Sequence, residues 1–365
     1  MKNRKIFSKI IILLGISLGA IFISFGSFYT YWNTASPDRT CASCHEIGSA
    51  VNSFSQSSHR DMNCKECHGT ALSNGIHSLK EKGMMVVSHV IENKPDPRMG
   101  EGQILEVMDN CKRCHASEFS AWMSGGHSAT YTDIFLDEKH NKTEQLNADC
   151  LRCHGMFYEG TTADLVEPIN TKGPWKLRDQ NKAGQPSIPC MACHEIHTDG
   201  EPSVRPDYSN PQSVFYSRKD SGTSLSYYAR FEKMHFSSKS LPKLHLTDGE
   251  KTVKVSDDHE MRNCIQCHAP NSWHEAGTSD DRTPRGVHEG ISCMACHEPH
   301  SNDARNSCKK CHPAISNCNL DVTTMNTTFA DPKSPNNIHW VSCTDCHKDD
   351  KTIQAMLNKK NKPKI

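Results

Sequence analysis

The sequence predicts a mainly α-helical fold with much irregular loop, one N-terminal transmembrane helix and a small β-hairpin near residues 243–255. Three observations support this prediction. The pattern Cys-x-x-Cys-His occurs nine times between Cys41 and His347 and uses eighteen of the nineteen cysteines. Hydrophobic residues make up only 35% of the 365 residues, which is little apolar volume to offset the conformational entropy lost on folding. The stretch from Ile10 to Trp32 contains no charged side chain.

The uncharged stretch is long enough to cross a bilayer as a helix. Basic residues before it place the N-terminus in the cytoplasm, and aromatic residues at its end suit the far membrane interface. These residues are Lys2, Arg4, Lys5 and Lys9, and then Tyr29, Tyr31 and Trp32. We expect residues 1–36 to be a single-pass anchor in a bacterial inner membrane, with the remainder in the periplasm. A cleaved secretory signal is the alternative.

The repeated motif predicts nine covalently attached c-type haems. Two thiols add across the vinyl groups of one haem, and the histidine that follows becomes an axial ligand of its iron. Zinc knuckles and thioredoxin-like sites also use Cys-x-x-Cys, but neither requires that histidine. With so little apolar volume, we expect the haems to form much of the core and the fold to depend on them. The predicted residues are Cys41, Cys44, His45, Cys64, Cys67, His68, Cys111, Cys114, His115, Cys150, Cys153, His154, Cys190, Cys193, His194, Cys264, Cys267, His268, Cys293, Cys296, His297, Cys308, Cys311, His312, Cys343, Cys346 and His347.

Each iron needs a second axial ligand unless its site is open for chemistry. The other thirteen of the 22 histidines exceed this demand, so most haems can be bis-histidine, which favours electron transfer over catalysis. The distal candidates are His59, His77, His89, His127, His197, His235, His245, His288, His300 and His339. His140, His259 and His274 follow no pattern and are doubtful.

Position along the chain narrows the choice for some candidates. A short helix predicted over residues 118–122 carries the chain from His115 to His127, near an adjacent haem. His197 and His300 each end a Cys-Met-Ala-Cys-His-Glu-x-His repeat. Both lie too close in sequence to their own haem to reach its far side, so they are expected to serve neighbouring haems.

Motif spacing divides the periplasmic part into a five-haem region, residues 37–200, and a four-haem region, residues 201–365. The long gap between them is predicted to contain a helix over Tyr227–His235 and then the hairpin, whose turn is Thr247-Asp248-Gly249. The basic tail, Lys348–Lys364, is expected to be solvated and disordered. Cys318 lacks the motif and is expected to be a plain thiol.

From the anchor to about Asp109 the chain resembles the NapC/NirT/NrfH family of membrane-anchored tetrahaem quinol dehydrogenases. The shared features are the single helix, Cys41-Ala-Ser-Cys-His45-Glu46, Ser58-His59, Cys64-Lys-Glu-Cys-His68 and the stretch from Lys80 and Lys82 to His89. The resemblance implies that the Cys41 haem receives electrons and that Lys80 or Lys82 contributes to a quinol site. Many members have methionine two residues after the first haem histidine, whereas this chain has Ile47, which favours ligation by His45.

From Cys111 onward the chain resembles the multihaem module of the tetrahaem cytochromes of ammonia-oxidising bacteria and of related octahaem reductases. The shared features are the Cys111 motif with Trp122 and His127, the Cys150 motif, and Arg285-Gly-Val-His288-Glu-Gly-Ile-Ser-Cys293. The resemblance implies closely packed haem pairs. Catalytic relatives often have a lysine in place of the motif histidine, and no Cys-x-x-Cys-Lys occurs here.

Two functions are compatible with these features. The first is a conduit that passes electrons from quinol, or from a quinol-oxidising membrane partner, to a periplasmic reductase or soluble cytochrome. The alternative is a terminal reductase of nitrite, hydroxylamine or a sulfur oxyanion with one open haem. The 42 basic and 42 acidic residues balance, so no overall field attracts nucleic acid.

Overall fold

The structure is a computed structural model of the whole chain. It describes residues 2–36, 39, 41–42, 47–69, 85–87, 90–91, 98–142, 146–169, 171–197, 225–243, 245–248, 250–268 and 290–301. The chain forms two compact units: Met1–Cys114 with His197–Asp199, and His115–Ile196 with Gly200–Ile365. The predicted boundary near residue 200 lies outside the described residues and stays a prediction.

The first unit contains one long helix and several short ones. The helices are α1 (Lys2–Thr34), α3 (Gly48–Ser55), α4 (Cys64–His68) and α6 (Glu101–Cys111). Helix α4 begins at Asn63, whose side chain accepts a hydrogen bond from the backbone N–H of Lys65, while the Glu66 side chain accepts one from the N–H of Asn63. This reciprocal capping stabilises a helix of only five residues.

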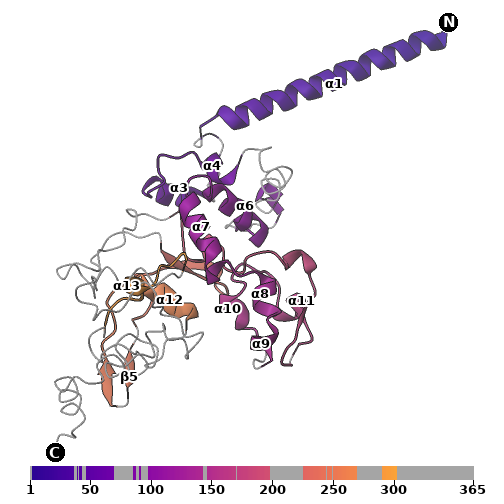
Figure 1. Ribbon diagram of the computed structural model, residues 1–365. Helices are drawn as coiled ribbons and strands as arrows, with labels where there is room; N and C mark the ends of the chain where they lie inside the picture. Colours follow the sequence, from indigo (N-terminus) through magenta and orange to yellow (C-terminus); the bar gives the residue numbers. More distant parts are fainter. Residues whose placement is uncertain are drawn as a thin grey trace, which may run out of the picture. The chain divides into compact units, whose positions relative to one another are not determined.

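Helix α1 is one unbroken helix (Figure 1). Its stretch from Ile6 to Trp32 is strongly apolar, with a mean hydropathy of 2.4, and the most apolar 18-residue window in it is not buried. By length and composition it could cross a membrane, although a secretory signal would have the same properties. A single apolar N-terminal helix is therefore confirmed, and membrane anchoring and orientation stay predictions.

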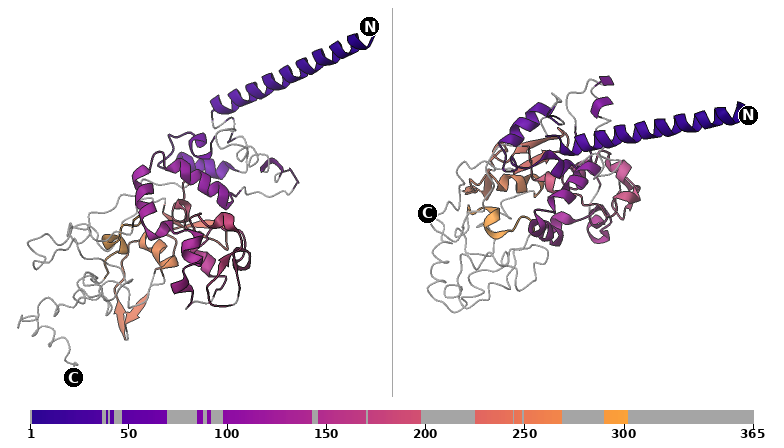
Figure 2. Two further views of the ribbon diagram at one scale, coloured as in Figure 1. Left: turned by 45° about the vertical axis from the view of Figure 1, so that its right-hand side comes forward. Right: turned by 90° about the horizontal axis from the view of Figure 1, so that it is seen from above.

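The second unit is built from short helices and two-stranded hairpins (Figures 1 and 2). Its helices are α7 (Ala116–Ser124), η3 (Gly126–Ser128), α8 (Tyr131–Phe135), α9 (Glu138–Asn141), α10 (Cys150–Cys153), α11 (Thr162–Leu165), η4 (Gln180–Lys182), η5 (Cys190–Ala192), α12 (Met261–Cys267) and α13 (Cys293–Cys296). Its antiparallel strand pairs are β1 (Val166–Glu167) with β2 (Lys176–Leu177), β3 (Ser226–Ala229) with β4 (Met234–Ser237), and β5 (Leu246–Asp248) with β6 (Lys251–Val253). Helix α7 covers the predicted helix at residues 118–122 and confirms it.

An apolar core lies among α8, α10, α11 and the β1–β2 pair, and Figure 1 shows the three helices close together. Its buried residues are Tyr131, Phe135, Leu146, Leu151, Leu165, Val166, Trp175 and Leu177. Burying a large apolar side chain contributes about 1.5–3 kcal/mol, so this cluster stabilises residues 131–177. Cys150 packs against the same cluster, and the core therefore positions one predicted haem motif.

The predicted helix over Tyr227–His235 is wrong. These residues form the β3–β4 hairpin, in which Tyr227 pairs with Phe236 and Tyr228 with His235. The turn uses Lys233 with a positive φ of 54°, a conformation usually left to glycine or asparagine. Because the turn lacks those residues, the sequence contains no hairpin signal.

The one predicted hairpin is confirmed. Strands β5 and β6 pair Leu246 with Val253, Thr247 with Thr252 and Asp248 with Lys251, inside the expected range of residues 243–255.

Candidate haem-binding centres

Four described motifs share one backbone feature. The N–H of the motif histidine donates a hydrogen bond to the carbonyl of the first cysteine, which closes a single helical turn and brings the two thiols and the imidazole together. The N···O distances are 2.9 Å from His154 to Cys150, 3.1 Å from His194 to Cys190, 2.8 Å from His268 to Cys264 and 2.9 Å from His297 to Cys293.

The described residues cover the predicted attachment residues in part. The second, third, fourth, fifth and sixth motifs are fully described, as are Cys41, Cys293 and His297. The third motif spans the junction of the units, since Cys114 ends the first and His115 begins the second. The predicted residues Cys44, His45, Cys308, Cys311, His312, Cys343, Cys346 and His347 lie outside the described residues, as does the side chain of Cys296.

Thiols of successive motifs lie close together in the first unit. The Cys41 thiol is hydrogen-bonded to that of Cys64, and this bond, with burial, raises the pKa of Cys64. Burial also raises the pKa of Cys67, and the nearby Cys114 acts in the same direction. The first three motifs are thus neighbours in space as well as in sequence.

Three motifs converge in the second unit. The thiols of Cys153 and Cys267 are hydrogen-bonded to each other, which lowers the pKa of Cys153 to about 7 and raises that of Cys267. Cys193 lies close enough to Cys264 and Cys267 to raise the pKa of both, although burial has the larger effect on Cys264, whose pKa is about 12. The fourth, fifth and sixth motifs therefore meet.

The β3–β4 hairpin holds these three motifs together. The N–H of Ser226 donates to the carbonyl of Cys193 at 2.9 Å, and Asn263 of α12 donates to the carbonyl of Ser226 at 2.8 Å. Phe157, three residues after His154, stacks on Tyr228 with ring centroids 4.0 Å apart. Sequence reasoning missed this scaffold because it assigned these residues to a helix.

Two motif thiols lie in buried, apolar surroundings. Burial raises the pKa of Cys190 to about 11 and that of Cys264 to about 12. A thioether to haem carries no charge and suits the same buried setting. Among the described residues, no three His, Cys, Asp or Glu side chains gather as a metal-ion site.

One motif histidine of the first unit faces a histidine from outside the motifs. The ring centroids of His68 and His197 are 5.9 Å apart, and the rings are inclined by 36°. Phe54 of α3 packs edge-on against His197 at 5.9 Å. Both histidines were predicted ligands, one proximal and one distal.

Two further pairs lie in the second unit. The ring centroids of His194 and His300 are 6.2 Å apart with nearly parallel planes, at 14°. Those of His268 and His127 are 6.1 Å apart, at 58°. Each pair again joins a motif histidine to a predicted distal candidate.

The ring-centroid distances of these three histidine pairs match those of two imidazoles that bind one metal ion from opposite sides. With metal–nitrogen bonds of about 2 Å, two such rings have centroids about 6 Å apart. The two ring planes can take any angle about the shared axis, so the range of inclinations is compatible. Aromatic rings that merely pack together also have centroids about 4.5–7 Å apart. Here, however, each motif histidine is paired with another histidine, which is the residue that a second axial position requires. The residues present therefore fit haem.

Three further histidines each lie beside a serine hydroxyl. His59 is partly buried beside Ser58, at 3.3 Å from its hydroxyl. His235 has Nδ1 at 2.8 Å from the Ser226 hydroxyl, and burial lowers the pKa of His235 to about 4. The doubtful His259 is buried, with Nδ1 2.9 Å from the Ser238 hydroxyl. His77, His89, His274, His288 and His339, with Lys80 and Lys82 and the side chain of His140, lie outside the described residues.

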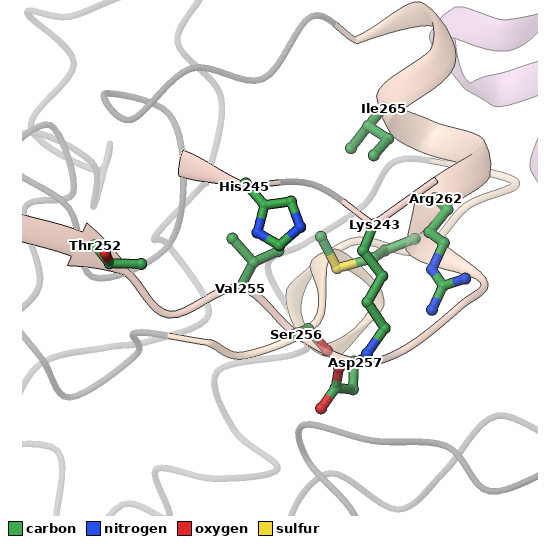
Figure 3. Close-up of a pocket in the computed structure, with 9 residues that line it drawn as sticks. Lys243, His245, Thr252, Val255, Ser256, Asp257, Arg262 and Ile265 are labelled. Atoms are coloured by element: carbon green, nitrogen blue, oxygen red, sulfur yellow. Dashed lines mark hydrogen bonds and ion pairs between the residues drawn. The ribbon is translucent and has the colours of Figure 1, made fainter. Parts of the chain in front are cut away.

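The candidate His245 lines a pocket of about 220 Å³ between the β5–β6 hairpin and α12 (Figure 3). The pocket residues are Lys243, His245, Thr252, Val255, Ser256, Asp257, Met261, Arg262 and Ile265. Two of its cations are engaged: Lys243 pairs with Asp257 at 2.6 Å, and Arg262 donates to the carbonyls of Lys239 and Leu241. Figure 3 places the His245 ring beside Val255.

A lysine inside the second motif joins that motif to the end of α1. The Lys65 ammonium donates to the carbonyl of Trp32 and, at 2.8 Å, to that of Ala35. It also lies 5.9 Å from the centre of the Trp32 ring. A cation that binds the last carbonyls of a helix complements its dipole. Sequence reasoning missed this role because the partners are some thirty residues away.

We expect Lys65→Met to loosen the junction after α1. The substitution removes a charged donor from two carbonyls, at a cost of about 1–2 kcal/mol, so local opening should become about 5–30-fold more frequent. The measurement is the rate of tryptic cleavage after Arg39 in the haem-loaded protein in detergent. Lys112→Met is the matched control, since Lys112 holds the same position in the third motif and is exposed. Equal cleavage rates in the two variants would contradict the assigned role.

Two family models match the chain. Outer membrane cytochrome MtrC/MtrF-like, domains II/IV, matches residues 35–203, and cytochrome c554 and c-prime matches residues 225–298. The first range contains five of the motifs and the second contains two. No curated protein and no solved structure matches the chain significantly.

Both families are multihaem c-type cytochromes, which carry covalently bound haem and transfer electrons. The matches support this broad class and not the NapC/NirT/NrfH type in particular. Taken with the repeated attachment motif and the imidazole pairs, they support a multihaem cytochrome c.

Proposed function

We propose that the protein is a membrane-anchored nonahaem conduit. It takes electrons from the quinol pool, directly or through a quinol-oxidising membrane partner, and passes them to a periplasmic reductase or soluble cytochrome. When bound, haem supplies a one-electron iron couple at each motif.

The pairing of motif histidines with second histidines is the observation that carries this proposal. Two imidazoles fill the axial positions of an iron, which suppresses the binding of small substrates and favours electron transfer. His68, His194 and His268 each face such a partner. Bis-histidine ligation at these sites supports a conduit rather than a terminal reductase.

We propose that electrons enter the protein at the haems of the first unit. There the Cys41 thiol is hydrogen-bonded to that of Cys64, and Lys65 binds the end of α1. If α1 spans the membrane, the first two haems lie close to the bilayer surface, where quinol is found. The match to an MtrC/MtrF-like domain favours a haem region outside the cytoplasm. The finer resemblance to NapC/NirT/NrfH and the quinol-site roles of Lys80 and Lys82 belong to this proposal.

The proposal predicts that a menaquinol analogue reduces the haems in membranes under anaerobic conditions. The measurement is the growth of the reduced haem absorption bands in membranes that contain this protein and no other overproduced component. The control is a variant that lacks residues 1–36 and is exported by a cleavable signal, which should be reduced much more slowly because it is not held at the bilayer. If the haems are reduced only after a partner protein is added, this protein does not oxidise quinol directly.

Electron paramagnetic resonance of the oxidised protein separates the conduit from a reductase. The conduit should show low-spin haem that does not respond to nitrite, hydroxylamine or sulfite. A high-spin signal that changes on adding one of these molecules would support the reductase and contradict the pure conduit. Mass spectrometry of the intact protein should show the added mass of nine haems.

A further inference from the structure

Two short segments of the second unit, far apart in sequence, lie against each other. One is the turn of residues 125–127, which links α7 to η3. The other is residues 299–301, which follow the seventh motif. A Cβ atom on Gly125 would lie 2.7 Å from the carbonyl oxygen of His300 and 2.9 Å from the carbonyl carbon and oxygen of Ser301. Only glycine permits this approach, because the obstructing atoms belong to the backbone and cannot rotate away.

A hydrogen bond fixes the orientation of the imidazole in the first segment. Nδ1 of His127 lies 3.0 Å from the carbonyl oxygen of Pro299. The carbonyl can only accept, so Nδ1 is the donor, and in the neutral imidazole this leaves the lone pair on Nε2. A backbone carbonyl bound to the far nitrogen is how ligating histidines are commonly held.

Each segment presents one histidine to a different motif. The His127 ring faces His268 of the sixth motif, with centroids 6.1 Å apart, and the His300 ring faces His194 of the fifth motif, with centroids 6.2 Å apart. Pro299, which orients His127, is the residue directly before His300. The position of each histidine therefore depends on the same backbone contact.

We propose that residues 125–127 and 299–301 form an interlock that supplies the distal ligands of two haems, His127 to the haem of the sixth motif and His300 to that of the fifth. This inference rests on the haem-binding function proposed above and assigns two distal positions that the sequence left open. Residues 299–301 begin two residues after the end of the seventh motif, so haem attachment there would also fix the segment that carries His300 and orients His127.

Gly125 is the positioning residue of this interlock, and its neighbour provides a matched control. Gly125 has an extended backbone, with φ of −106° and ψ of 170°, which alanine adopts without strain. An added methyl group at this position therefore acts only by pushing residues 300–301 away. A Cβ atom on Gly126 would meet nothing within 4 Å, so Gly126→Ala adds the same group without the collision.

The test measures the spin state of the haems in the full, haem-loaded, oxidised protein by electron paramagnetic resonance. We expect Gly125→Ala to convert two haems from low spin to high spin and Gly126→Ala to convert none. His127→Ala and His300→Ala should each convert one haem, because each removes one imidazole and leaves the glycine contact intact. Added imidazole should restore low spin in these two histidine variants. Mass spectrometry should show the full haem number in every variant.

Several results would overturn the interlock. One is low-spin haem throughout in His127→Ala or His300→Ala, because that histidine would not be a ligand. Another is an identical spectrum for Gly125→Ala and Gly126→Ala. If Gly125→Ala fails to load haem, the two histidine variants still decide the ligand assignment. A wild-type protein without covalent haem would instead refute the proposed function.

Discussion

The full-length chain prepared without haem attachment is expected to show no cooperative thermal unfolding transition, whereas the haem-loaded chain is expected to unfold cooperatively. Hydrophobic residues make up only 35% of the sequence, and the main described apolar cluster is confined to residues 131–177. The described haem motifs lie in or at the ends of helices of at most 11 residues, and isolated helices this short are unstable in water. Covalent haem therefore has to provide the apolar surface on which these turns pack.

Differential scanning calorimetry of both preparations in the same detergent makes this measurement. Near-ultraviolet circular dichroism of the haem-free chain should also be weak, while helix α1 keeps its far-ultraviolet signal in the micelle. The apolar core around Phe135 and Trp175 is the part most able to survive, so a weak, broad transition from it is compatible with the expectation. A sharp transition of the haem-free chain with an enthalpy close to that of the loaded protein would refute haem dependence.

Local features of this fold were predictable from sequence. The motif helices, helix α7 and the β5–β6 hairpin each depend on residues that are close together in the chain, such as Asp248 and Lys251, which pair at the closed end of the hairpin. The β3–β4 hairpin was not predicted because Lys233 adopts a positive φ in place of glycine, and because aromatic residues in β3 and β4 fit a short helix as well as a strand.

For the candidate haem centres, too, the sequence predicted local features and not contacts between distant segments. Motif spacing predicted the attachment residues and nominated His127, His197 and His300 as distal ligands. It could not pair them, because each pairing depends on how segments far apart in sequence pack. The contact between Gly125 and residues 300–301 and the reach of Lys65 to the end of α1 are of this kind.

Phe135→Ala is expected to destabilise the second unit by about 3–5 kcal/mol, the usual cost of removing a buried aromatic ring from a packed core. Phe135 is 2% exposed and stacks on Tyr131 with ring centroids 6.2 Å apart. Its carbonyl accepts a hydrogen bond of 2.6 Å from the buried amide of Asn141, so the neighbouring backbone is held in place and cannot easily collapse into the cavity.

The measurement is the urea midpoint of the haem-loaded protein, followed by far-ultraviolet circular dichroism, with Phe231→Ala as the matched control. Phe231 is 62% exposed in the turn of the β3–β4 hairpin of the same unit, so its removal should change stability by no more than about 0.5 kcal/mol. Because Cys150 packs on the core that contains Phe135, only Phe135→Ala should also shift the reduction potential of one haem. Equal midpoints for the two variants would mean that haem packing, rather than this apolar cluster, stabilises residues 131–177.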